Sequence, residues 1–363
     1  MYKLLHIVLG FLILAVVSVS CTKTTDEPVA PVLAELEVII PSVVGDEGNR
    51  EVVKRVRFIV FKNMTTDARL DVNEYTETTS SIAVTNFSAK LKATVSDNSM
   101  VIVIVNEPTA MKNVLDAISG TRDAENMIFN IADIMNAAGA ISDMPMIGVK
   151  RDIAVVAEPG PTDNKVKMVV ERAVARVDIY LEAMPGSVST GYTENSSVML
   201  HNVSYQSYFA MGNVDNGTRD NTTETWKNYG KVMQNVAVQD VPKTWPTGTD
   251  ETWFYIPGNA ANNRQMLASF YVAERLFTTD FPGDRLAVSM ANIKRANLLT
   301  GTTERVVIDK ITPKEGGNEE DFNEIRRNNV YEITARVGAV SEITFVSVSV
   351  EAWVPLNVDI PIN

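Results

Sequence analysis

The sequence predicts a mainly β protein with two short helices, organised as two β-sandwich domains. Many segments alternate strictly between apolar and polar residues, which is typical of half-buried β-strands. Loops rich in Gly, Asn, Thr and Pro separate these segments, as in sandwich folds. The chain of 363 residues is also long enough for two domains of ordinary size.

The last stretch, residues 343–363, carries the longest alternation in the chain. Its even positions are apolar: Val346, Val348, Val350, Ala352, Val354, Leu356, Val358, Ile360 and Ile362. As one strand, positions 346–362 would run roughly 55 Å, whereas ordinary strands span about 17–20 Å. Pro355 and Pro361 lack an N–H group and favour a strand edge or a break. We therefore predict an internal strand followed by an extension over 354–363; the alternative is a bent tail on the same sheet.

The N-terminus has the pattern of an export signal. Lys3 precedes an apolar run from Leu4 to Val17, which is too short for a membrane span, so residues 1–20 are expected to be a signal peptide. Small residues then lead to Cys21, the only cysteine, in an arrangement that resembles a bacterial lipobox, although Ser18 stands where that pattern usually has Leu. Residues 21–31 would form a lipidated tether. A plain signal peptide with an incidental cysteine is the alternative.

The first domain is expected to cover residues 32–171. Its first strand presents five alternating aliphatic residues: Val32, Ala34, Leu36, Val38 and Ile40. A loop ending at Arg50 follows, and further strands are predicted at 52–61, 87–95 and 101–105. Apolar residues at helical spacing predict helices over 111–118 and 127–134.

The second domain is expected to cover residues 172–353. The apolar residues lie at even positions before Glu171 and Arg172 and at odd positions after them, which is a change in the phase of the alternation. A strand cannot change face without a bulge or a junction. Further strands are predicted at 198–209, 253–257, 265–274, 285–290, 305–311 and 330–337.

Composition argues against several functions. The net charge of −12 opposes nucleic-acid binding. Once the signal peptide is removed, His201 is the only histidine, and its strand pattern indicates a structural role. The segment Asp71-Val72-Asn73-Glu74 lacks the full ligand spacing of a calcium loop, and Glu319-Glu320-Asp321 is typical of a solvated loop. We expect no catalytic residues, no metal and no cofactor.

Several motifs in order resemble the FimA/Mfa-type fimbrillins, the type V pilins. They are the lipobox, the first strand with its Arg-bearing loop, Val170-Glu171-Arg172-Ala173-Val174-Ala175-Arg176-Val177, Phe254-Tyr255-Ile256-Pro257, Arg327-Asn328-Asn329-Val330-Tyr331 and the terminal strand. The resemblance implies two transthyretin-like domains and export to the outer membrane as a lipoprotein acylated at Cys21. It further implies cleavage by an arginine-specific protease between Arg50 and Glu51, and polymerisation with other fimbrial subunits by strand exchange at the cell surface, with adhesion to host or bacterial receptors.

The residues themselves support strand exchange. The first strand and the extension, Val354-x-Leu356-x-Val358-x-Ile360-x-Ile362, both present five alternating aliphatic side chains. A groove emptied of five such side chains would lose on the order of 10 kcal/mol of burial and would favour a replacement strand.

Two alternatives remain open. The chain could be an anchor subunit of the same fimbria, which need not be cleaved, or a tip subunit, which needs no donor tail. A surface glycan-binding lipoprotein would need an aromatic platform, for which the candidates are Trp226, Trp245 and Trp253.

Overall fold

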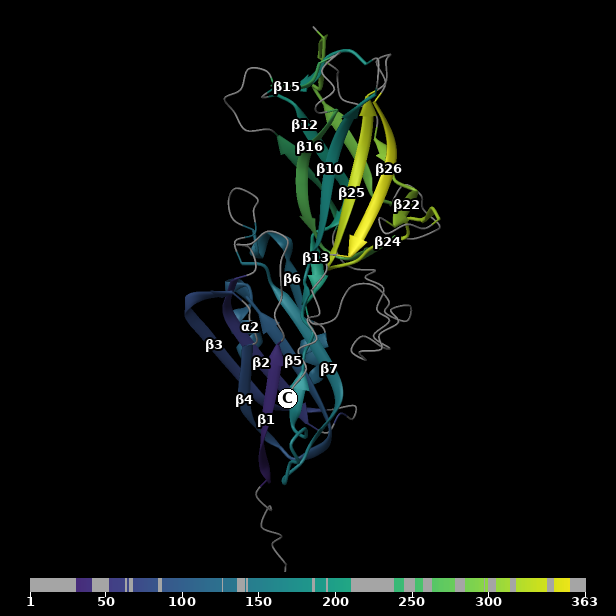
Figure 1. Ribbon diagram of the computed structural model, residues 1–363. Helices are drawn as coiled ribbons and strands as arrows, with labels where there is room; N and C mark the ends of the chain where they lie inside the picture. Colours follow the sequence, from purple (N-terminus) through teal and green to yellow (C-terminus); the bar gives the residue numbers. More distant parts are fainter. Residues whose placement is uncertain are drawn as a thin grey trace, which may run out of the picture. The chain divides into compact units, whose positions relative to one another are not determined.

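A computed structural model gives the fold (Figure 1). It describes residues 31–40, 52–62, 64, 68–83, 87–125, 127–135, 141, 143–184, 187–193, 195–209, 238–244, 252–256, 263–277, 285–296, 298–299, 305–313, 318–337 and 343–352. Most of these residues lie in β-strands, which confirms the predicted fold class.

Two sheets are built from the first half of the chain. A five-stranded sheet has the order β3-β2-β5-β7-β9, and a three-stranded sheet has the order β4-β1-β8. The strands are β1 Leu33–Ile40, β2 Val52–Lys62, β3 Arg69–Ala83, β4 Phe87–Thr94, β5 Ser96–Val105, β7 Met146–Val155, β8 Lys165–Lys167 and β9 Glu171–Arg172. Side chains of both sheets share one hydrophobic core, as expected of a β-sandwich.

The second half of the chain contributes three larger sheets, with strand orders β16-β10-β25-β26-β22-β23, β14-β12-β18-β21 and β15-β11-β19-β20. Their bounds are β10 Ala175–Ala183, β11 Thr190–Tyr192, β12 Ser197–Ser204, β14 Val238–Thr244, β15 Thr252–Tyr255, β16 Arg264–Val272, β18 Ala287–Ala291, β19 Lys294–Arg295, β20 Leu298–Leu299, β21 Val306–Val307, β22 Lys310–Pro313, β23 Glu320–Asp321, β25 Asn329–Val337 and β26 Ile343–Ala352. Two short pairs complete the described strands: β6 Ile128–Asn130 with β13 Gln206–Tyr208, and β17 Arg275–Leu276 with β24 Glu324–Ile325.

Two clusters of buried apolar side chains form the cores. Residues before Ala175 supply most of the first cluster, and the second consists of residues from Ala175 onward. The apolar phase change lies at this transition. There β8, β9 and β10 are three separate strands, each in a different sheet, so the phase changes at junctions between strands. The domain limits at 171 and 172 stay a prediction.

Helical segments cover part of the first core. They are the 3-10 turns η1 Thr109–Met111 and η2 Ile131–Asp133, and the α-helices α2 Lys112–Asp116 and α3 Thr121–Glu125. The helix predicted near 111–118 corresponds to η1 and α2, which together end at Asp116. Met111 and Leu115 are buried in these segments, and Ile118 is buried just after them.

The segment predicted as a second helix, 127–134, adopts another structure. It forms the short strand β6 followed by the turn η2. Met127, Phe129 and Ile131 are all buried at a spacing of two residues, and β6 pairs with β13 from the second half of the chain. Partners that are distant in sequence therefore outweigh the local helical spacing.

The terminal alternation begins as predicted with an internal strand. β26 lies between β25, with which it pairs antiparallel, and β22, with which it pairs parallel. It ends at Ala352, and residues 353–363 lie outside the described part of the chain. The extension over residues 354–363 therefore remains a prediction.

Candidate functional site

The first strand, β1, is the middle strand of its sheet. It pairs antiparallel with β4 along its whole length, from Leu33 opposite Thr94 to Ile40 opposite Phe87. On its other side it pairs parallel with β8, with Glu37 opposite Lys165. Two backbone bonds mark that side: the Glu37 N–H donates to the Asn164 carbonyl at 2.7 Å, and the Met168 N–H donates to the Ile39 carbonyl at 2.8 Å. β1 therefore separates two strands that have no pairing with each other in the described sheet.

One face of β1 contacts the core. Leu36 and Val38 are both 0% exposed. Their partners in the register are Leu91 and Ala89 of β4, and Val38 also lies opposite Val166 of β8. Leu91 and Val166 belong to the same buried cluster as Leu36 and Val38. Removing β1 would therefore open an apolar groove between β4 and β8.

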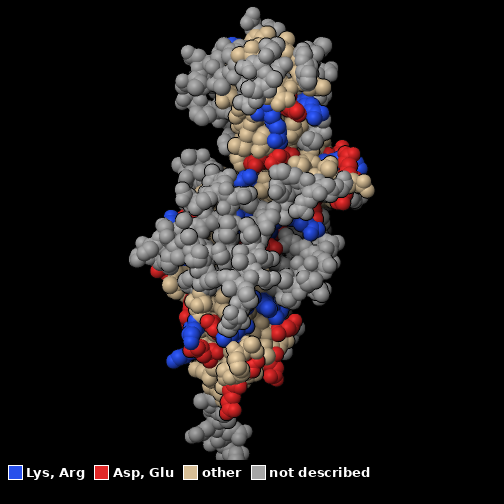
Figure 2. Space-filling view, viewed as in Figure 1, with Lys and Arg blue, Asp and Glu red and all other residues tan. Residues whose placement is uncertain are grey.

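The other face of this sheet carries rows of opposite charge. β1 contributes Glu35 and Glu37, which lie opposite Lys92 and Lys90 of β4. The Lys90 ammonium lies 2.8 Å from the Glu35 carboxylate, and this hydrogen bond raises the pKa of Lys90 above its ordinary value. β8 adds the exposed Lys165 and Lys167. The lysines on the two strands that flank β1 are thus Lys90, Lys92, Lys165 and Lys167. Figure 2 shows acidic and basic side chains intermixed over the described part of the face in view.

The burial of β1 is smaller than five aliphatic side chains would give. Val32 precedes the strand and is 57% exposed, Ala34 is partly buried, and the side chain of Ile40 lies outside the described part. The two fully buried side chains, at roughly 1.5–3 kcal/mol each, give about 3–6 kcal/mol. Together with the ladder bonds on both edges, this still makes β1 an integral strand rather than a loose segment.

Two motifs noted in the sequence meet through hydrogen bonds. Arg172 Nη1 donates to Asn328 Oδ1 at 3.1 Å, and the Asn328 N–H donates to the Val174 carbonyl at 2.9 Å. Asn328 has a φ of 59°, a left-handed conformation that Asn tolerates better than most residues. The motifs around Arg172 and Arg327 thus have a structural role next to the transition between the two cores.

Arg327 lies at the centre of a buried polar cluster. Its guanidinium is 3.0 Å from the Glu274 carboxylate, and both side chains are buried. It also donates to the carbonyls of Phe209 at 3.0 Å and Tyr208 at 2.7 Å. The cluster ties residues 207–209 to the start of β25.

Comparison with solved structures identifies the fold. A fimbrillin (fimA) from Porphyromonas gingivalis superposes with a TM-score of 0.56 at 15% identity, and the match covers 89% of this chain and 98% of that one. The chain has the fimbrillin fold. The tip fimbrial protein Mfa3 from Porphyromonas gingivalis, solved with a C-terminal truncation, gives a TM-score of 0.52 at 13% identity and covers 88% and 100% of the two chains. No protein-family model and no curated protein matches the sequence. At these identities the likeness establishes the fold, and it bears out the resemblance drawn from the motifs.

Several residues expected to matter in a chain with the fimbrillin fold lie outside the described part: Cys21, Arg50, Glu51, Val354, Leu356, Val358, Ile360 and Ile362. Their roles remain predictions. So do those assigned to Trp226 and Trp245, and the side chain of Trp253 in β15 is likewise not described.

The basic residues that follow Arg50 lie in β2. Arg57 pairs with Tyr75 of β3 and Ile104 of β5, so its backbone is in the middle of a sheet. Its side chain is buried and forms ion pairs with Glu107 at 2.6 Å and Asp116 at 2.7 Å. A protease needs an extended and accessible backbone, which Arg57 does not offer. Sequence patterns did not reveal this network, because its partners are distant in the chain.

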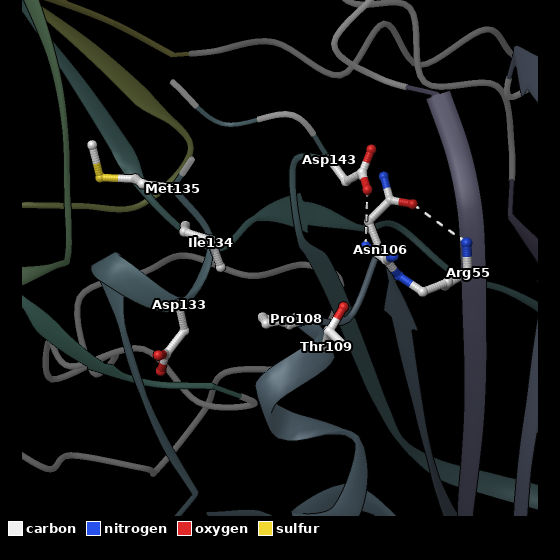
Figure 3. Close-up of a pocket in the computed structure, with 8 residues that line it drawn as sticks. All are labelled: Arg55, Asn106, Pro108, Thr109, Asp133, Ile134, Met135 and Asp143. Carbon is white, nitrogen blue, oxygen red and sulfur yellow. Dashed lines mark hydrogen bonds and ion pairs between the residues drawn. The ribbon is translucent and has the colours of Figure 1, made fainter. Parts of the chain in front are cut away.

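A polar cavity of about 160 Å³ lies near the start of η1, lined by Arg55, Asn106, Pro108, Thr109, Asp133, Ile134, Met135 and Asp143. Figure 3 shows Arg55, Asn106 and Asp143 grouped on one side of it. Arg55 Nη2 is 3.0 Å from Asp143, and Asn106 Oδ1 accepts from the Lys54 N–H at 2.9 Å. These groups bind one another and stabilise the end of β5, so the cavity is explained by the fold.

The remaining candidates for chemistry have structural partners. Nε2 of His201 is 2.8 Å from Ser289 Oγ on the neighbouring strand. The segment around Asp71 is part of β3 rather than a loop, and Asp71 accepts from the Thr94 N–H at 2.6 Å. Asp321 lies in β23 and pairs with Lys310 at 2.6 Å. Within the described residues there is no group of three or more potential metal ligands, and no helix there is long and apolar enough to cross a membrane.

Proposed function

We propose that this chain is a structural subunit of a cell-surface fimbria that polymerises by donor-strand exchange. The observation that carries the proposal is the position of β1 between β4 and β8. A chain cut after β1 could release that strand and expose a groove with unpaired backbone groups on both edges and apolar side chains along its two sides, including Leu91 of β4 and Val166 of β8. Such a groove strongly favours a replacement strand.

The replacement strand in this proposal is the C-terminal extension, residues 354–363, of another subunit. Its alternating residues Val354, Leu356, Val358, Ile360 and Ile362 match the period of β1. Cleavage between Arg50 and Glu51 would free β1, because Arg50 follows β1 and precedes β2 in the chain.

Export and anchoring complete the proposal. Acylation of Cys21 would hold the precursor at the outer membrane, and removal of residues 21–50 would detach the subunit from the lipid for assembly. The fimbria would then mediate adhesion to host or bacterial surfaces.

A tip or anchor subunit is a second candidate, favoured by the structural likeness to a protein named as the tip fimbrial protein Mfa3. The two roles differ in the use of the extension, because a tip subunit accepts a strand without donating one.

The test is deletion of residues 354–363. For a shaft subunit we expect a folded monomer with unchanged thermal unfolding and no polymer ladder on gels. N-terminal sequencing of sheared wild-type filaments should begin at Glu51, and Arg50→Ala should yield uncut, unassembled chain. A deletion variant that polymerises normally would overturn the extension as the donor strand, and filaments that retain residues 21–40 would overturn strand exchange.

A further inference from the structure

The first strand and the extension share a six-residue motif. β1 and its next residue read Leu36-Glu37-Val38-Ile39-Ile40-Pro41, and the extension reads Leu356-Asn357-Val358-Asp359-Ile360-Pro361. Leu, Val, Ile and Pro recur at the same positions, and only the two intervening residues differ. We propose that the extension of a second copy of this chain occupies the groove in the single register set by this motif, so that Leu356 replaces Leu36 and Val358 replaces Val38. The inference rests on the proposed function, because it presupposes that β1 leaves.

Side-chain size supports this register. The pockets left by β1 are those of Leu36 and Val38, both fully buried among Leu91, Val166 and their neighbours. The motif register refills them with identical side chains. A shift of two residues would place Val358 or Val354 in the Leu36 pocket, and a missing methylene in a packed core costs stability. A shift of one residue would turn the whole apolar set outward.

The two prolines exclude both neighbouring registers. The Glu37 N–H and the Ile39 carbonyl both bond to the β8 side, so the odd positions of β1 direct their backbone groups toward β8. Shifting the extension by two residues one way places Pro361 at position 39, and shifting it the other way places Pro355 at position 37. Either proline would remove an N–H from that ladder. In the motif register Pro355 takes the place of Glu35, before the pairing with β8 begins at Glu37, and Pro361 takes the place of Pro41.

Charge on the outer face agrees with the same placement. Asp359 would take the position of Ile39, which lies opposite the exposed Lys167 of β8. Opposite charges at directly facing positions stabilise a strand pair. Asn357 would take the position of Glu37, opposite Lys90. The second copy therefore brings a carboxylate to a groove edge where β1 has an aliphatic residue.

Disulfide trapping tests the register. Positions 37 of β1 and 90 of β4 face each other. Because the backbone groups of position 37 bond toward β8, positions 37 and 90 form a non-hydrogen-bonded pair. The Cα atoms of such a pair lie about 4.5 Å apart. Disulfides need Cα separations of about 4.4–6.8 Å, whereas diagonal neighbours lie about 7–8 Å apart. In the full-length chain, whose own Cys21 is removed with residues 21–50 on cleavage, the double variant Lys90→Cys with Asn357→Cys should give a covalent ladder after cleavage, polymerisation and oxidation, with most subunits cross-linked.

The matched control is Lys90→Cys with Asp359→Cys, which is two residues out of register and should give no ladder above the single-cysteine background. In the uncut protein, Glu37→Cys with Lys90→Cys should cross-link within one chain and so establishes that the site can form a disulfide. A ladder with Asp359→Cys instead of Asn357→Cys overturns the register but leaves strand exchange intact.

The remaining outcomes separate this inference from the function on which it rests. Purified cut chain that polymerises only when another fimbrial subunit is added overturns the choice of a second copy as the donor. Absence of filaments under every condition, in cells and in vitro, overturns the proposed function as well.

Discussion

Two leucines of β1 offer a sharp measurement of how tightly that strand is held. Leu36 is 0% exposed and lies opposite Leu91, whereas Leu33, in the same strand, is 55% exposed. Replacing a buried Leu by Ala removes its transfer free energy and leaves a cavity, at a cost of about 2–5 kcal/mol. Replacing an exposed Leu changes stability by about 0.5 kcal/mol or less.

Hydrogen exchange reports this difference locally, without treating the whole chain as one cooperative unit. The Glu37 amide is bonded to the Asn164 carbonyl and exchanges when β1 opens. Each 1.4 kcal/mol is a tenfold change in the opening equilibrium. Leu36→Ala in the uncut chain should therefore accelerate exchange in β1 by about 30-fold to several thousand-fold, and Leu33→Ala should leave it within about threefold.

Equal acceleration in the two variants would refute the reasoning, because the buried Leu36 would then stabilise β1 no more than the exposed Leu33 does. Unchanged exchange with Leu36→Ala would refute it as well, because any opening that breaks the contacts of Leu36 must become more frequent once that side chain is truncated. Acceleration that extends equally to β25, in the second core, would mean that the variant destabilises the whole chain rather than one strand.

Three further predictions concern other parts of the chain. Arg327→Ala should lower the free energy of unfolding by about 3–5 kcal/mol, because Glu274 would remain charged and buried. Lys310→Ala, which breaks the exposed pair with Asp321, should cost about 1 kcal/mol or less. Chemical denaturation compares the two variants, and similar losses would contradict the role of burial. Burial raises the pKa of Tyr331 to about 12, above its ordinary value near 10. The stability that the neutral Tyr331 contributes to the folded state is therefore fully present below pH 10 and is lost as the pH rises from 10 to 12. Tyr331→Phe should flatten the dependence of unfolding free energy on pH in that range, and an unchanged slope would contradict the assignment to Tyr331. Cys21→Ala should abolish labelling by a radioactive fatty acid and leave precursor uncleaved, whereas continued labelling would rule out the lipobox assignment.

Alternation predicted the strands that are buried on one face. The residues of β1 and β10 show it clearly, and the structure places strands there. β3 was not predicted, although it is the longest described strand, because Thr, Glu and Ser dominate it. It lies at the edge of its sheet and pairs with β2 alone, so little apolar periodicity is required of it.

The buried charges could not be predicted from local sequence. Arg57 lies among apolar residues of β2, and its partner Glu107 is 50 residues away. Arg327 reaches carbonyls about 120 residues away in the chain, such as that of Tyr208. Only the folded topology brings such groups together, and the same holds for β6 and β13, whose pairing converts a helical spacing into a strand. The sequence predicted the apolar face of β1, but it did not predict that β4 and β8 pair with the two edges of that strand.

The connection between β1 and β2 has a consequence for competition between strands. Only residues 41–51 separate the two strands in sequence, and a strand tethered by a short connection acts at an effective concentration on the order of millimolar. A free strand with the same side chains must exceed that concentration to displace it. Cutting the chain between the strands ends this advantage at once and alters no contact of Leu36 or Val38. Proteolysis would thus set the time at which the intramolecular binding of β1 becomes a competition that depends on the concentration of other subunits.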